Sequence, residues 1–226
     1  MSDPTATRTS PRPGCALLAL PVLMTVVMVA AYAALAVFGY VGRPADGPVQ
    51  TIQFEGCADA GAVVLARARL MGLGDPKLAP TPAGFSLTAQ MPADEGVTRG
   101  IPPTLVIPGH VSLADAVTGE ELLGDDAVDG AFPHMQLSGI PVTRLLLTDG
   151  AVTYLRKMAG VEPTRRVVVI IDGVRVHEAD VAHYPTNGEL DLEVDADTRA
   201  SQLEVAAARA IALGEGPLPC EIRVIP

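Results

Sequence analysis

The segments Val142-Thr-Arg-Leu-Leu-Leu-Thr-Asp149 and Val167-Val-Val-Ile-Ile-Asp-Gly173 decide the fold of this chain. The first predicts a strand that leads into a helix, because Thr148 or Asp149 can cap the amino terminus of that helix. The β-branched run of the second is typical of a strand covered on both faces. The Asp172-Gly173 pair at its end predicts a type I′ hairpin turn. A strand, a helix and a hairpin in this order indicate a mixed α and β domain.

Elements with equally clear periodicity continue to the end of the chain. Residues 189–195 alternate acidic and apolar side chains, which predicts a strand with one apolar face and one row of carboxylates. The alanine-rich stretch Thr198 to Gly214 predicts a helix that lies close to a sheet, and Glu221 to Ile225 predicts a last strand. A solvated strand face explains the acidic row, since a catalytic dyad would need a second acid across a cleft.

The first part of the domain also alternates strands and helices. Gln50 to Glu55 predicts a short strand, and Ala58 to Met71 predicts an amphipathic helix that nearby glycines end. Phe85 to Met91 alternates apolar and polar residues as far as Pro92, which predicts a half-buried strand.

Residues 93–136 give weaker signals, because proline, glycine and aspartate are frequent there. We expect short elements at residues 104–107 and 110–117, and an exposed acidic loop from Gly119 to Gly130. Calcium binding by this loop is the alternative interpretation, but the spacing of an EF-hand is absent.

Three phrases of the second half occur in an order and spacing that resemble a known family. They are Leu147-Thr-Asp-Gly-Ala-Val-Thr-Tyr154, Val168-Val-Ile-Ile-Asp-Gly-Val-Arg-Val176 and Ala212-Leu-Gly-Glu-Gly-Pro-Leu-Pro219. With the first strand and helix, they resemble the first extracytoplasmic domain of SecD, the membrane subunit that assists protein export. The resemblance covers Ile52 to Val224. It departs from the family at Tyr154, where phenylalanine is usual, at Asp180, where proline is expected, and after Gly188, where a glycine-rich phrase is lost.

The SecD resemblance implies an α+β fold made of two subdomains. Residues 49–115 and 217–226 would form a base that resembles a ferredoxin-like sheet, and residues 116–216 would form an inserted α+β head. In that arrangement Cys57 and Cys220 belong to the same subdomain, so they either form a disulfide or remain two unpaired thiols. We expect Cys15, outside the domain, to be an inert thiol.

An apolar segment precedes the domain. From Ala16 to Tyr40 the chain has 25 consecutive uncharged residues, enough for a helix to cross a hydrocarbon core about 30 Å thick. We therefore expect a cytoplasmic tail at residues 1–15, a single transmembrane helix at 16–41 and a linker at 42–48. Arg8 and Arg12 precede the span, so the positive-inside bias places the domain outside a bacterial inner membrane. A cleaved signal peptide is the alternative, because small-residue cleavage sites occur late in the apolar run.

The portion after the predicted span is acidic. From Arg43 onward it contains 14 basic and 25 acidic residues, a formal charge of −11, and no basic stripe. Nucleic acid is therefore not an expected partner. Anionic headgroups would repel the domain, so we expect membrane attachment through the N-terminal helix alone. The span has no ionisable residue, and the five further membrane helices of SecD-like proteins, which carry the proton-coupling carboxylate, do not follow in this sequence, so we expect no proton-driven transport by this chain alone.

The sequence shows no enzyme motif. His177-Glu178 and His183 resemble part of a zinc protease motif, but histidines six residues apart do not share one face of a helix. No serine lies in a G-x-S-x-G turn. We therefore expect no enzyme, no metal and no cofactor, with an unrecognised hydrolase as the weakest alternative.

The favoured hypothesis is a membrane-anchored SecD-like domain that assists protein export. Its partners would be unfolded or exported polypeptide, or membrane proteins of the export machinery. The hypothesis predicts an apolar groove between head and base, lined by Phe132, Met135, Tyr154 and Tyr184, although ordinary core packing or isolated exposure also explains each of these residues. The alternative is a structural or assembly domain that contacts another membrane protein, which predicts an exposed apolar patch of at least a few hundred Å².

Overall fold

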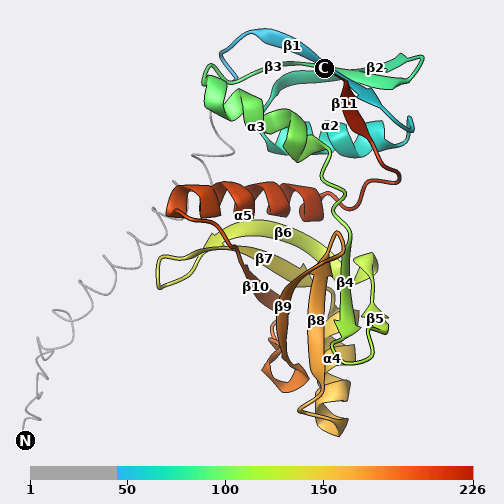
Figure 1. Ribbon diagram of the computed structural model, residues 1–226, viewed down its shortest axis with the longest axis vertical. Helices are drawn as coiled ribbons and strands as arrows, with labels where there is room; N and C mark the ends of the chain where they lie inside the picture. Colours follow the sequence, from blue (N-terminus) through green and yellow to red (C-terminus); the bar gives the residue numbers. More distant parts are fainter. Residues whose placement is uncertain (1–44, 226) are drawn as a thin grey trace, which may run out of the picture. The chain divides into compact units, whose positions relative to one another are not determined.

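The structure, a computed structural model, describes residues 45–225 (Figure 1). Outside the described residues lie the predicted cytoplasmic tail with Cys15, the predicted membrane helix and residues 42–44 of the predicted linker. Within residues 45–225, no helix combines the length and the apolar character needed to cross a membrane. These residues form an α+β domain, as the sequence predicts.

The base has the strand and helix order of a ferredoxin-like fold. Its elements are β1 (Val49–Glu55), α2 (Ala60–Leu70), β2 (Gly74–Thr81), β3 (Gly84–Gln90), α3 (Glu95–Leu105) and β11 (Arg223–Ile225). The four strands form an antiparallel sheet in the order β11-β1-β3-β2. The remaining elements are inserted between α3 and β11, so the base is built from the beginning and the end of the domain.

One apolar core holds the base sheet to its helices. Phe54 of β1 and Phe85 of β3 are register partners, and their rings stack with centroids 5.0 Å apart. Val64 of α2 and Leu105 of α3 are fully buried in the same cluster. The two strands and the first helix predicted for this part of the chain are confirmed.

Strand β2 was not predicted from the sequence. Its residues Gly74-Asp-Pro-Lys-Leu-Ala-Pro-Thr81 contain two prolines and lack a regular alternation of apolar side chains. The strand pairs only with β3, and the register shifts between Gly74 and Lys77. Proline is tolerated in a strand at the edge of a sheet, because one side of the backbone needs no partner.

Helix α3 was also not predicted, although it occupies part of the weakly patterned region. Asp94 caps it, with its carboxylate accepting bonds from the N–H groups of Gly96 and Val97 at 2.9 and 3.2 Å. The helix contains Pro102 and Pro103, which lower helix propensity strongly. The cap and the burial of apolar side chains on its inner face therefore stabilise a helix that local propensity disfavours.

The head consists of two sheets, two α-helices and two short 3-10 helices. Its elements are β4 (Val111–Asp115), β5 (Glu121–Leu123), η1 (Asp125–Ala127), β6 (Val128–Met135), β7 (Pro141–Leu147), α4 (Asp149–Val161), β8 (Arg166–Ile171), β9 (Val174–Asp180), η2 (Val181–His183), β10 (Glu189–Glu193) and α5 (Arg199–Gly214). One sheet has the order β10-β7-β6 and the other the order β5-β4-β8-β9. Side chains of both sheets and of α4 share one core.

The head shows the local features that the sequence predicts for it. The Thr148 hydroxyl caps α4 by accepting a bond from the N–H of Ala151 at 3.3 Å. Asp172 and Gly173 have φ values of 49° and 80°, as a type I′ turn between β8 and β9 requires. The strand β8 is buried over Val167, Val168 and Val169.

The predicted boundary between base and head needs one correction. Strand β4, assigned to the base as part of residues 49–115, pairs with β8 of the head. Val111 and Leu113 are buried in the head core, because β4 directs its apolar side chains there. The acidic segment from Gly119 to Gly130 is likewise not only a loop, since it contains β5, η1 and the start of β6.

Candidate functional site at the junction of base and head

The chain passes between base and head twice, and the two passages are hydrogen-bonded to each other. Residues 106–110 lead from α3 into β4, and residues 215–222 lead from α5 back to β11. The N–H of Leu218 donates to the carbonyl of Pro108 at 2.8 Å. The head is therefore joined to the base through one narrow pair of backbone segments.

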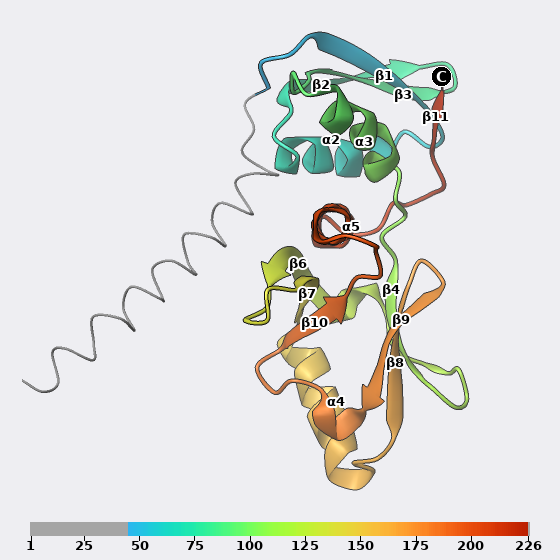
Figure 2. The same cartoon turned by 60° about the vertical axis from the view of Figure 1, so that its left-hand side comes forward.

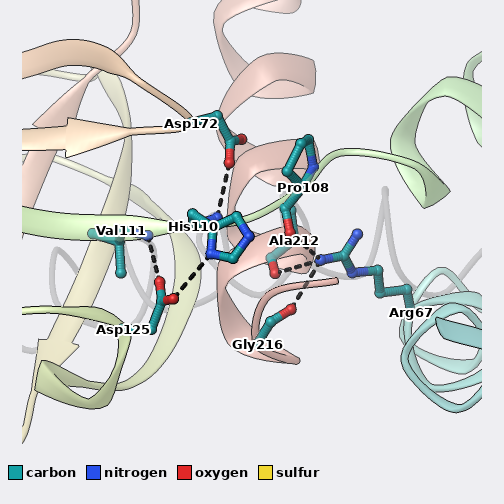
Figure 3. Close-up of polar contacts among 8 residues, drawn as sticks. All are labelled: Arg67, Pro108, His110, Val111, Asp125, Asp172, Ala212 and Gly216. Atoms are coloured by element: carbon teal, nitrogen blue, oxygen red, sulfur yellow. Dashed lines mark hydrogen bonds and ion pairs between the residues drawn. The ribbon is translucent and has the colours of Figure 1, made fainter. Parts of the chain in front are cut away.

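Arg67 of α2 extends into this junction and is fully buried. Its guanidinium donates to the carbonyls of Ala212 at 3.0 Å and Gly216 at 2.9 Å (Figure 3). At the end of α3 it donates to the carbonyl of Leu105 at 3.2 Å, and on the passage that follows it donates to the carbonyl of Ile107, with a longer bond of 3.4 Å to Pro108. One side chain of the base thus binds the carboxyl-terminal ends of α3 and α5 together.

No carboxylate lies within hydrogen-bonding distance of this buried cation among residues 45–225. Burial lowers the pKa of Arg67 to about 10, an effect that Asp172 and Glu215 oppose at longer range. The carboxyl ends of α3 and α5 carry partial negative charge, which favours a cation at this position. The Nε atom of Arg67 is buried and has no hydrogen-bond partner within the described chain.

Gly109 allows the first passage to approach Arg67. Its φ of +78° lies in the region that favours glycine. A Cβ atom there would lie 2.7 Å from the carbonyl oxygen of Ala212 and 2.9 Å from Nη2 of Arg67. The close contact of the two passages therefore depends on the missing side chain.

Two aspartates fix the point where the first passage enters the head. The backbone N–H of His110 donates to Oδ1 of Asp172 at 2.8 Å, and that of Val111 donates to Oδ1 of Asp125 at 2.6 Å (Figure 3). Nδ1 of His110 lies 3.0 Å from Oδ2 of Asp125. These groups surround a hollow of about 280 Å³. In the described part of the chain, no three His, Cys, Asp or Glu side chains are placed to hold a metal ion.

Helix α5 lies between the two subdomains (Figure 2). It contacts β6 and β7 of the head on one side, and α2 and α3 of the base on the other. Small side chains dominate its buried positions: Ala206, Ala207, Ala210 and Ala212.

A disulfide joins Cys57, which follows β1, to Cys220 at the end of the second passage. The two Cα atoms are 6.4 Å apart, and the residues are separated by 163 positions in the sequence. The bond connects the passage that returns from the head to the amino-terminal part of the base. It therefore closes a loop that contains the whole head.

The four side chains predicted to line a peptide groove do not lie together. Phe132 and Met135 are both on β6, but their register partners are Arg144 and Pro141 at different positions along β7. Tyr154 is 40% exposed on α4. Tyr184 is buried in the head core, where its hydroxyl donates to the carbonyl of Val167 at 3.0 Å. The large apolar ring of Tyr184 fills the core, so this residue does not present a surface to a peptide.

The acidic row of β10 faces a basic residue that sequence reasoning missed. Arg144 of β7 binds Asp191 through Nε at 2.6 Å and Nη2 at 3.0 Å, and Glu189 through Nη1 at 2.8 Å. The bond to Arg144 lowers the pKa of Asp191. The row is therefore partly neutralised, and it forms part of the cross-strand packing.

His177 and His183 lie on consecutive elements of the head, β9 and η2. The His177 ring packs edge-on against Tyr184 with centroids 5.9 Å apart, and burial lowers its pKa. His183 belongs to η2, which follows the strand that carries His177.

Sequence reasoning missed Arg67 and Gly109, yet one signal for Arg67 was present. Arg67 is three residues after Val64 and seven after Ala60, so it falls on the apolar stripe of its helix. A charged residue on a buried stripe needs several hydrogen-bond partners. For Gly109, no local pattern indicated that a second passage would lie against it.

Comparison with known proteins shows a likeness in fold. No family model matches the chain, and no curated protein matches it in sequence. A crystal structure of SecDF in its super-membrane-facing form matches with a TM-score of 0.64 and 13% identity, over 90% of this chain and 34% of that one. A second SecDF structure, described as a membrane component that enhances protein export, matches with a TM-score of 0.60 and 14% identity, over 78% of this chain and 98% of that one. The chain spans about a third of the length of the first SecDF chain. Because the sequence identities are low, the comparison shows a SecDF-like fold.

Proposed function

We propose that this protein is a membrane-anchored extracytoplasmic SecD-like domain that assists protein export by binding unfolded polypeptide. The likeness of its base and head to SecDF structures supports this role most directly. The acidic charge after residue 43 and the apolar segment before it are compatible with a domain held at an inner membrane by one helix. The apolar segment at residues 16–40 contains no charged side chain, so the proposed role does not include a proton relay through that segment.

The junction supports a head that changes its orientation on the base. The connection consists of two backbone segments, and α5 contacts α2 and α3 of the base. Arg67 binds carbonyl oxygens, which water can also satisfy when the junction opens. A few bonds would therefore be exchanged without opening either apolar core.

Exposed apolar side chains of the head support binding of unfolded chains. Leu137 in the turn between β6 and β7 is 98% exposed, and Ile140 and Phe132 nearby are exposed to 40% and 37%. All three residues belong to the β6–β7 hairpin. Unfolded polypeptides expose the Leu, Ile and Phe side chains that such exposed residues can cover.

In-cell photo-crosslinking tests the proposal. A photoreactive residue would replace Leu137 in the full chain, with Lys77 on the exposed edge of the base as the control position. Crosslinks from Leu137 to many exported proteins are the expected result. One discrete membrane partner would favour the assembly domain instead, and equal labelling from Lys77 would contradict a specific surface.

A genetic test addresses energy coupling. Expression of this chain in cells that lack their own SecD should leave the export defect unchanged. Rescue of export would contradict a role without proton coupling.

A further inference from the structure

The edge of the base sheet beside β1 is only partly covered. Strand β11 pairs with Gln53, Phe54 and Glu55, whereas β1 begins at Val49. On the other side, all seven residues of β1 pair with β3. Residues 49–52 therefore have a backbone partner on one side only, among the residues that the structure describes.

The alternation of an antiparallel ladder identifies which backbone groups are open. Pro48 accepts a bond from the N–H of Met91, next to the first pair of β1 and β3. Residues in hydrogen-bonded pairs alternate along a strand, so Gln50 and Ile52 bond toward β3. Val49 and Thr51 therefore direct their N–H and C=O groups away from β3, to the edge at which β11 pairs with residues 53–55.

Four other edge strands of the described domain carry features that disfavour pairing. β2 contains Pro76 and Pro80, and β6 contains Pro133. β9 and β10 carry several charged side chains. Proline and charge are the usual protection of an exposed edge. The segment Val49-Gln-Thr-Ile52 has neither.

A hollow lies against the same part of β1. It measures about 500 Å³ and is lined by Pro48, Gln50, Pro92, Ala93, Glu95, Thr98, Arg99 and Pro102. Glu95, Thr98, Arg99 and Pro102 share one face of α3, at spacings of three, four and seven residues. Gln50 alternates with Ile52 and Phe54, so it projects to the helix side of the sheet. An open strand edge and a helix face thus border one groove.

We propose that this groove between β1 and α3 binds an extended segment of unfolded polypeptide, which adds to β1 as an antiparallel strand in line with β11. The open N–H and C=O groups of Val49 and Thr51 require an extended backbone as partner. Alternate side chains of that segment would enter the hollow, where prolines and Ala93 favour apolar groups. Arg99 and Glu95, 3.6 Å apart, give the rim no net charge. This inference rests on the proposed function and assigns the backbone of the bound polypeptide to the base.

Peptide titration of the full chain in nanodiscs tests the groove. The probe is a fluorescent ten-residue peptide of alternating leucine and glutamine, with empty nanodiscs as the blank. Thr51→Pro removes an outward N–H at an edge position that accepts proline, and we expect it to weaken binding about tenfold. Thr51→Val is the matched control, because it loses the same hydroxyl contact to Thr88 but keeps the N–H. It should bind like the wild type.

A second arm does not depend on the variant's folding. Two versions of the same peptide carry N-methyl groups on either one or the other set of alternate residues. Only the version that is methylated on the N–H groups facing β1 cannot donate to the edge, and it should bind the wild type about tenfold more weakly. The edge is not the site if Thr51→Pro binds the unmethylated peptide as tightly as the wild type does and the wild type binds both methylated peptides equally tightly. Binding at the β6–β7 hairpin would in that case still agree with the proposed function. If the wild type binds no peptide at hundreds of micromolar, both proposals are wrong.

Discussion

The base and the head are fastened by different chemistry. In the base, the Cys57–Cys220 disulfide joins the two parts of the chain that form the sheet. In the head, ion pairs join distant segments: Arg165 binds Asp115 at 2.8 Å, and Arg144 binds Asp191. We therefore expect reductant to destabilise mainly the base and acid to destabilise mainly the head, whereas Arg67 connects the two.

The largest expected effect comes from breaking that connection. Arg67→Ala removes the donor to five carbonyls, several of them buried, and should lower the free energy of unfolding by about 3 to 5 kcal/mol. We also expect the unfolding curve to separate into a head and a base transition. Chemical denaturation followed by circular dichroism measures both.

Arg69 is the matched control for this experiment. It is an exposed arginine on the same helix, so Arg69→Ala should change the free energy of unfolding by less than about 0.5 kcal/mol. Equal effects of the two substitutions would show that Arg67 does not hold the junction.

The disulfide should have the next largest effect. Cys220→Ser should lower the stability of the base by about 3 kcal/mol, because the bond constrains a long loop of the unfolded chain. Cys15→Ser, outside the described residues, is the control and should be neutral. Alkylation of Cys57 and Cys220 in the native protein without reductant would contradict the bond.

Two helix caps compare the subdomains on a smaller scale. Thr148→Ala in the head and Asp94→Ala in the base each remove a side chain that accepts bonds from the first turn of a helix. Each should cost about 1 kcal/mol. Thr153→Ala, at an exposed position inside α4, should cost nearly nothing. If thermal unfolding shows both cap variants shifting the same single transition, the subdomains unfold together.

Acid should lower the stability of the head, and this is the smallest of the expected effects. The backbone N–H groups of Thr118 and Val117 lower the pKa of Asp115 to about 2, and Arg165 adds to this effect. A folded-state pKa below the ordinary value near 3.8 means that the contribution to stability is present above about pH 4 and is lost as the pH falls toward 2. Asp115→Asn should remove this part of the pH dependence in melts between pH 2 and 5. An unchanged slope would show that other carboxylates account for it.

The sequence predicts those elements of the fold whose signals are local. Thr148 and the Asp172-Gly173 turn act within a few residues, so cap and hairpin could be identified without the rest of the chain. β2 and α3 could not, because both contain prolines that local rules exclude. They form because the edge of the sheet tolerates Pro76 and because Asp94 and the core stabilise α3.

The candidate site depends on contacts between distant residues. Arg67 and Ala212 are separated by 145 positions, and Gly109 is needed only because α5 returns beside it. The spacing of Arg67 from Ala60 and Val64 would allow its placement on a buried stripe, but it could not identify the helix ends that surround the side chain. Local sequence also could not place Tyr184, one of the predicted groove residues, because an aromatic residue after a strand can lie either in the core or on the surface.

The disulfide also determines how the domain would carry mechanical load. It bonds Cys57, two residues after the end of β1, to Cys220, three residues before the start of β11. Tension applied between these two strands would pass through the sulfur atoms and the strands that flank them. The head, inserted in the closed loop, would lie outside this load path. A polypeptide pulling on the base could therefore leave the head relaxed, whereas one pulling on the head would load the two passages, the bonds of Arg67 and the contacts of α5 with α2 and α3.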